Sequence, residues 1–177
     1  MRENNFVGYE YRDVTVKRNM ASVIVDGYEN FGWEVESTGE TIDNLTTIDK
    51  MVIKFKRDRK IRNKAELTRL QRNFDACISD IDSLEKSKFV KPSVVAYLIG
   101  IIGTAFMAGS VFCVIASKII PCIILAVPAF IGWMLPYFLY KSILKKKTEE
   151  VTPLIDKKYD EIYTVCEKAN ALLDSAD

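Results

Sequence analysis

The sequence predicts an α+β integral membrane protein: a small βαββ head, a long cytoplasmic helix, a two-helix transmembrane hairpin and a returning helix. Three observations lead to this fold class. Residues 92–140 are almost free of charge, whereas the rest of the chain is rich in Lys, Arg, Asp and Glu. Two heptad patterns flank that apolar block. Shorter strand-like and helix-like patterns precede both of them.

Length and composition exclude several classes of function. The 177 residues accommodate about one ordinary domain with attachments. A net charge of +1 gives no preference for nucleic acid, and a chain without histidine has no imidazole for catalysis or metal binding. The cysteines form no CxxC pair and are typical of small apolar residues in a reducing compartment: Cys77, Cys113, Cys122 and Cys166. We therefore expect no enzyme activity, no cofactor and no metal site.

Residues 1–58 are expected to form the cytoplasmic βαββ head. Strands are expected over residues 9–16, from residue 33 onward and over residues 51–56. One face of the intervening helix is spaced by 3 and 4 residues: Met20, Val23, Ile24, Tyr28 and Phe31. Gly32 is expected to end this helix in the left-handed conformation.

The aromatic residues of the head have two interpretations. Tyr9, Tyr11 and Trp33 are expected to belong to the core of this small domain, as aromatics in such domains usually do. The alternative is that they form a platform for a ligand.

Three short motifs of the head resemble a small bacterial domain family of unknown function. They are YEY at residues 9–11, GWEV at residues 32–35 and FKR at residues 55–57. The resemblance implies a βαββ fold but no activity and no catalytic residue, and this chain has a longer, more polar linker between the last two strands. The whole layout also resembles uncharacterised bacterial two-span membrane proteins, which implies the bacterial cytoplasmic membrane as location.

Residues 59–91 and 141–177 are expected to form two coiled-coil helices. The first apolar seam steps by 3 and 4 residues through Leu67, Leu70, Phe74, Cys77, Ile81 and Leu84. The second steps likewise through Ile155, Tyr159, Ile162, Cys166, Ala169 and Leu173. Within the second helix, Thr152 and Pro153 suit an N-cap and a first helical position.

The two seams are expected to meet in an antiparallel stalk. They lie at equal distances from the apolar block, and a hairpin joins the two chains at one end. Equal distances place Phe74 opposite Tyr159, Leu70 opposite Ile162 and Leu67 beside Cys166. The alternative is that each seam faces a copy of itself in an oligomer.

Residues 92–140 are expected to form the transmembrane hairpin, with spans at 92–116 and 119–140. As helices these spans are about 37 and 33 Å long, enough for a hydrocarbon core of about 30 Å. Lysines cluster outside both spans, and Lys118 alone stands in the connection, which places both termini in the cytoplasm. Small residues on the first span are expected to pack against a helix: Gly100, Thr104 and Ala108 in one row, Ala105 and Gly109 in another.

A basic patch follows the third strand of the head. Its seven members are Lys54, Lys56, Arg57, Arg59, Lys60, Arg62 and Lys64. Such a run is typical of a solvated strand end, and its functional alternative is a contact with an acidic protein partner or a neighbouring subunit. We expect no nucleic acid, because the only aromatic residue in the run is Phe55.

These features together lead us to expect a membrane-anchored scaffold or binding protein that self-associates. The lipid bilayer and further copies of the chain are its expected partners. The alternative is an oligomeric channel or transporter-like pore with a regulatory head. A pore would have to be lined by apolar groups and hydroxyls, since no acidic residue occurs between Pro92 and Tyr140.

Overall fold

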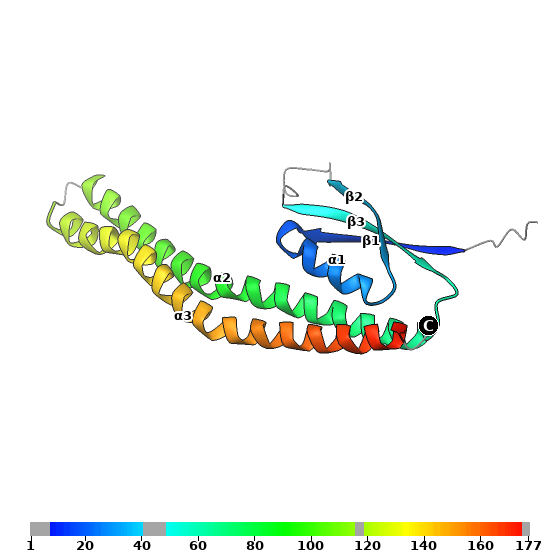
Figure 1. Ribbon diagram of the computed structural model, residues 1–177. Coiled ribbons are helices and arrows are strands. Elements are labelled where there is room, and N and C mark those ends of the chain that lie inside the picture. Colours follow the sequence, from blue (N-terminus) through cyan, green and yellow to red (C-terminus); the bar gives the residue numbers. More distant parts are fainter. Residues whose placement is uncertain (1–7, 41–48, 116–118, 175–177) are drawn as a thin grey trace, which may run out of the picture. The chain divides into compact units, whose positions relative to one another are not determined.

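The computed structural model describes residues 8–40, 49–115 and 119–174 of the chain. In order, the elements are β1 (Tyr9–Lys17), the 3-10 turn η1 (Arg18–Met20), α1 (Ala21–Glu29), β2 (Glu34–Glu40), β3 (Lys50–Asp58), α2 (Lys64–Ile115) and α3 (Ile119–Asp174) (Figure 1). The α+β class and the βαββ order of the head are confirmed. Lys118 lies outside the described residues.

The chain divides into two compact units. Unit 1 consists of Met1–Ser79 together with Lys158–Asp177, and unit 2 consists of Asp80–Lys157. Unit 1 therefore combines the head with the first turns of α2 and the last turns of α3. Unit 2 contains the apolar hairpin.

The head in unit 1 contains a three-stranded antiparallel sheet with the strand order β1-β3-β2. Its β1 pairs with β3 from Tyr9 opposite Asp58 to Lys17 opposite Lys50. Its β2 pairs with the other edge of β3, with a bulge between Val35 and Ser37. The apolar side chains of β3 alternate as the sequence predicts, and its central residues Ile53 and Phe55 are fully buried.

Helix α1 packs on the buried face of this sheet. The Tyr28 ring stacks on Phe55 with 4.5 Å between ring centroids, and Phe31 just beyond the helix is also fully buried. Gly32 has the predicted left-handed conformation, with φ of 76°. The chain then turns so that the backbone N–H of Trp33 donates to the Tyr28 carbonyl oxygen at 3.2 Å, which brings the Trp33 side chain into the core.

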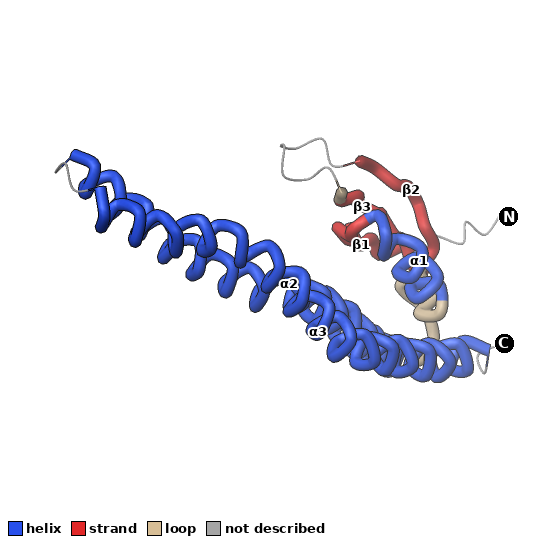
Figure 2. The backbone as a smooth tube through the Cα atoms, turned by 90° about the vertical axis from the view of Figure 1, so that its left-hand side faces the viewer, coloured by secondary structure: helices blue, strands red, loops and turns tan. Residues whose placement is uncertain are grey.

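Within unit 1, the start of α2 and the end of α3 lie side by side and antiparallel (Figures 1 and 2). The side-chain amide of Asn63 donates to the Leu172 carbonyl oxygen, and the Cys77 thiol lies 3.7 Å from a Glu161 carboxylate oxygen. Most of the predicted seam is buried here: Leu67, Leu70, Phe74 and Cys77 on α2, with Ile162 and Ala169 on α3. Tyr159 and Cys166 are half-buried.

In unit 2 the two helices are continuous through their prolines. Pro92 lies inside α2, and Pro128, Pro136 and Pro153 lie inside α3. The interpretation of Thr152 and Pro153 as an N-cap and a first helical position is therefore wrong. Its neighbours Val151 and Ile155 are both buried, so packing holds the helix on either side of the one backbone hydrogen bond that the proline removes.

Candidate functional site

The first candidate site is the contact between the head and α2 in unit 1. The Phe74 ring of α2 is fully buried against the head, with its centroid 5.9 Å from that of Tyr28 and 5.6 Å from that of Phe31. Both pairs are edge-to-face, a favourable aromatic geometry. Gly27 is required at this point, because a Cβ there would collide with the Phe74 ring. Phe74 thus completes the core of the head.

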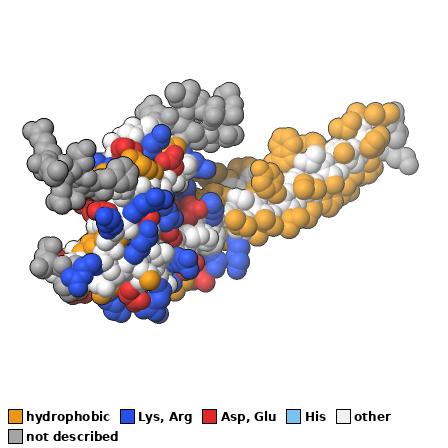
Figure 3. Space-filling model, turned by 90° about the vertical axis from the view of Figure 1, so that its right-hand side faces the viewer, with side chains coloured by type: hydrophobic (Ala, Val, Ile, Leu, Met, Phe, Trp, Pro, Cys, Tyr) orange, Lys and Arg blue, Asp and Glu red, His pale blue; other side chains and the backbone are white. Residues whose placement is uncertain are grey.

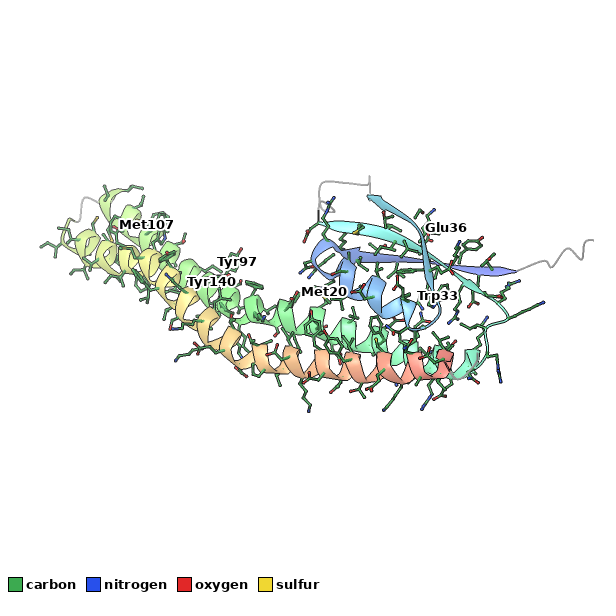
Figure 4. All side chains as sticks on the ribbon, in the orientation of Figure 1. Met20, Trp33, Glu36, Tyr97, Met107 and Tyr140 are labelled. Carbon is green, nitrogen blue, oxygen red and sulfur yellow. The ribbon has the colours of Figure 1, made fainter. Side chains whose placement is uncertain are left out.

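The predicted pairing of Phe74 with Tyr159 stays a prediction. The ring contacts of Phe74 in the structure are those with the head. The Tyr159 hydroxyl lies 3.5 Å from the sulfur of Met20, a residue of η1 (Figure 4 labels Met20). Both seams therefore have a second role that their heptad spacing did not indicate, because they also contact the head.

Polar side chains surround the Phe74 contact. One Asp75 carboxylate oxygen accepts a hydrogen bond from Arg12 at 2.9 Å, and the other accepts one from the Tyr28 hydroxyl at 3.0 Å. Burial, together with the neighbouring Asp75 charge, raises the pKa of Tyr28 to about 12. The Trp33 indole N–H donates to the side-chain oxygen of Gln71 at 3.0 Å. These hydrogen bonds fix the orientation of α2 on the head.

A partly buried charge cluster, in which Arg57 is the buried member, lies in the same contact. The Arg57 guanidinium forms two 2.6 Å contacts with one Glu10 oxygen and donates to the Phe31 carbonyl oxygen at 3.1 Å. It also stacks on the Trp33 ring, 4.4 Å from its centroid. Lys64, the first residue of α2, binds the other Glu10 oxygen at 2.6 Å. Burial alone would raise the pKa of Glu10, but hydrogen bonds and charges from Lys64 and Arg57 lower it.

The predicted basic patch is divided among several surfaces. Arg57 is 4% exposed and Lys64 is bound to Glu10, so these two residues have structural roles. Lys56 lies 5.6 Å above the Tyr9 ring and 3.6 Å from Glu34, on the sheet face opposite α1. The exposed members include Lys54 on that face and Arg59, Lys60 and Arg62 before α2. A contact with an acidic partner stays a prediction for these exposed members.

The open face of the sheet corrects the expectation for two tyrosines. Tyr9 and Tyr11 are 43% and 62% exposed, so they are not core residues, whereas Trp33 is. The inward face of β1 instead carries Glu10 and Arg12, whose partners are charged groups of α2 and β3. The partners of Glu10 and Arg12 are distant in sequence, so the alternation of side chains along β1 does not reveal them.

The second candidate site is the hairpin of unit 2, where the two helices meet at a pair of glycines. A Cβ at Gly132 would lie 2.9 Å from the Cα of Gly103, so neither position has room for a larger residue. Ala129 is fully buried, and the buried Ser110 hydroxyl donates to the Cys122 carbonyl oxygen at 3.1 Å. Close backbone approach of this kind is how helices associate in lipid.

The predicted small-residue rows are not this contact. No atom lies within 4 Å of a Cβ placed at Gly100, and the other exposed members are Thr104, Ala105 and Ala108. Gly109 faces Leu125, whose nearest atom would lie 3.8 Å from an added Cβ. The sequence clue to the observed contact was Gly132, the one glycine between residues 119 and 140. A close approach of two helix backbones at Gly132 requires an equally small residue on the other helix.

A groove of about 650 Å³ lies on the hairpin beside the glycine pair. From α2 it is lined by Ser93, Ala96, Tyr97, Gly100, Ile101 and Thr104, and from α3 by Trp133, Pro136 and Tyr140. Figure 4 shows Tyr97 and Tyr140 at one level of the two helices. The lining is apolar apart from hydroxyl groups, so the groove suits an apolar ligand and offers no carboxylate, imidazole or amine for catalysis.

Much of the hairpin surface is apolar and exposed, as the space-filling view in Figure 3 shows. Tyr97, Phe112, Ile115 and Ile120 are all more than 70% exposed. Among the described residues, no three His, Cys, Asp or Glu side chains are grouped as a metal site would require.

The chain matches no protein-family model, no curated protein and no solved structure.

Proposed function

We propose that this protein is a membrane-anchored scaffold or binding protein of the bacterial cytoplasmic membrane, with unit 2 as anchor and unit 1 as cytoplasmic binding module. The observation that supports it is the exposed apolar surface of the hairpin. The most apolar windows of α2 and α3 have mean hydropathies of 2.3 and 2.0, but only 11% and 6% of these windows is buried. Exposure of so much apolar surface to water is unfavourable, whereas a bilayer would cover it.

The orientation follows from the lysines at the two ends of the hairpin. Lys88 and Lys91 precede the first span, and Lys141, Lys145 and Lys146 follow the second. Such clusters are retained on the cytoplasmic side. Both termini, and with them unit 1, would then be cytoplasmic.

The binding role is supported by the way the head is built. Phe74, the Arg57 cluster and the hydrogen bonds to Asp75 hold it firmly on the helices of unit 1. The opposite face of the sheet stays open and carries Tyr9 and Tyr11. A rigid module with exposed aromatic residues offers a surface on which a protein partner can dock. An antiparallel coiled coil between the ends of α2 and α3 would support this module.

Self-association belongs to the same proposal. The apolar surface that α2 and α3 leave exposed in unit 2 would serve contacts between copies as well as contacts with lipid. An oligomeric pore is the competing function. It requires a ring of subunits around a continuous path, whereas one hairpin is closed by the contact between Gly103 and Gly132.

Cysteine labelling tests the anchor and its orientation. In a chain whose four native cysteines are replaced by alanine, Ile120→Cys reports the connection end of the hairpin and Tyr163→Cys reports unit 1. Both positions are exposed, at 75% and 72%. A membrane-impermeant maleimide on intact cells should modify the Cys at 120 and spare the Cys at 163. The reverse pattern refutes the orientation, and recovery of the chain in the soluble fraction refutes the anchor.

The oligomer and the pore are tested with the purified full-length chain. Its mass in detergent gives the number of copies, and ion flux through vesicles that contain it reports a pore. A self-associated chain without flux supports the scaffold. Flux that scales with the amount of protein would favour the pore instead.

A further inference from the structure

The groove on the hairpin matches one bilayer leaflet in length. From Ser93 to Thr104 it follows α2 for eleven residues, a rise of about 16 Å. One leaflet of a hydrocarbon core about 30 Å thick measures about 15 Å. Its volume of about 650 Å³ lies within the range of small-molecule sites in proteins. A single extended acyl chain is therefore the kind of ligand whose length the groove fits.

The floor of the groove is open because of Gly100. Nothing lies within 4 Å of the place where its Cβ would be, so the backbone of α2 is accessible there. Walls are provided by Ile101 from α2 and by Trp133 and Pro136 from α3. Because the residue at the floor is small and the residues at the walls are bulky, the groove forms a channel that suits a narrow, flexible chain.

The charged residues beside the groove lie at one of its ends. Ser93 and Tyr140 line that end, Lys91 precedes it by two residues and Lys141 follows it directly. Both lysines are exposed. The sequence from Lys86 to Lys147 contains lysines but no acidic residue. Two acids outside this range pair with its end lysines, Asp82 with Lys86 and Glu150 with Lys147, and Glu150 also interacts electrostatically with Lys91. Positive charge at one end thus adjoins an apolar channel.

We propose that the groove binds a phospholipid with an anionic headgroup from the cytoplasmic leaflet. The acyl chain lies over Gly100 toward Thr104, and the phosphate lies beside Lys91 and Lys141 with hydroxyl groups of Ser93 and Tyr140 within its reach. This inference rests on the proposed membrane anchor. In this proposal a lipid chain, and not a second helix, contacts Gly100 and Thr104 of the predicted small-residue row.

A second copy of the hairpin fits the groove less well for reasons of charge. Two copies that met symmetrically here would bring two sets of lysines to the same height, and like charges in contact are unfavourable. An anionic headgroup has the opposite effect, because cytoplasmic lysines near the surface attract anionic lipid. The distribution of charge therefore favours lipid.

Tryptophan quenching by brominated lipid tests the proposal in the full-length chain. The protein has two tryptophans: Trp133 lines the groove and is 58% exposed, whereas Trp33 is buried in unit 1. Vesicles contain a small and stepwise increased mole fraction of phosphatidylglycerol or phosphatidylcholine, brominated at the same acyl-chain position. Bromine quenches only on contact, and a Trp133→Phe variant gives the background from Trp33.

Brominated phosphatidylglycerol should quench Trp133 at a lower mole fraction than brominated phosphatidylcholine, and the quenching should saturate. Replacement of Lys91 or Lys141 by glutamine should weaken this preference about fivefold for each lysine removed. Gly100→Leu should abolish it by filling the floor of the groove. Ala108→Leu, in the same row but outside the groove, is the matched control and should leave it unchanged.

Other outcomes overturn the proposal. Equal quenching by both lipids, unchanged in the lysine variants and in Gly100→Leu, means that ordinary bilayer lipid covers this face. Weak quenching by both lipids, together with a disulfide between copies of a Thr104→Cys variant, means that a second copy occupies the groove. No quenching by either lipid, with the chain left in the aqueous phase, refutes the membrane anchor itself and is thereby distinguished from failure of the lipid site alone.

Discussion

Replacement of Phe74 by alanine should destabilise unit 1 more than any other truncation on the first turns of α2. The ring is fully buried and touches Tyr28 and Phe31 edge-on. Loss of a buried phenyl ring costs about 3–5 kcal/mol, the two aromatic pairs included. Small domains have a free energy of unfolding of about 5–15 kcal/mol, so this change removes a large share of it.

Urea unfolding of the full-length chain in detergent measures the effect. Emission of the buried Trp33 reports unit 1, and Trp133→Phe removes the signal of the hairpin. Tyr163→Ala is the matched control, because Tyr163 is an aromatic residue of α3 in the same unit and is 72% exposed. It should change the free energy of unfolding by no more than about 0.5 kcal/mol.

A double-mutant cycle shows which residue Phe74 contacts. Gly27→Ala adds a methyl group that collides with the ring and should cost about 1–3 kcal/mol. In a Phe74→Leu background the collision is relieved, so the two changes should couple by more than about 0.5 kcal/mol. Additive effects for Gly27 and Phe74, with coupling between Phe74 and Tyr159 instead, would refute the contact with the head and restore the pairing of the two seams.

Three further changes have directions that follow from the structure. Gly103→Leu should separate α2 from α3 at Gly132 and lower the thermal stability of the hairpin in detergent, whereas Gly100→Leu should not. Glu10→Gln should lower the free energy of unfolding of unit 1 by about 1–3 kcal/mol at pH 7, measured by urea unfolding. Because the folded-state pKa of Glu10 is depressed, its stabilisation is complete above the ordinary pKa of 4.5 and is lost as pH falls below it, so this variant should show a weaker acid dependence. Trp33→Phe should cost about 1–3 kcal/mol, since it leaves a buried amide oxygen of α2 without its donor. Because this change removes the fluorescent reporter of unit 1, its urea unfolding is followed by far-ultraviolet circular dichroism.

Local patterns predicted much of the fold because the residues that determine it are close in sequence. The helical spacing from Met20 to Phe31 and the left-handed Gly32 follow from contacts within a few turns. The same holds for the alternation in β3 and for the two long helices. Each of these elements carries its own apolar period, which the printed sequence displays.

Pairings between distant elements could not be predicted in this way. The charged inner face of β1 is stable only because Asp75 and Lys64 of α2 and Arg57 of β3 lie opposite. An alternation that mixes tyrosines with charged residues therefore led to the wrong face of the strand. The choice between Gly100 and Gly103 likewise depended on the second helix, since both lie on the same span and only Gly103 meets a glycine.

The head needs the two long helices for its own stability. A βαββ element of about 50 residues buries too little surface for more than marginal stability by itself. The helices of unit 1 supply what it lacks, since Phe74 fills the space over Gly27, Gln71 binds Trp33, and Lys64 completes the charge cluster of Glu10. Phe74, a heptad residue of α2, therefore contacts the head, and Cys77 lies beside Glu161 of α3, so substitutions in this seam should affect the stability of the head. For the proposed function it follows that the binding module includes the first turns of α2 and the last turns of α3. A fragment ending at residue 58 would lose part of its core and with it the open face of the sheet.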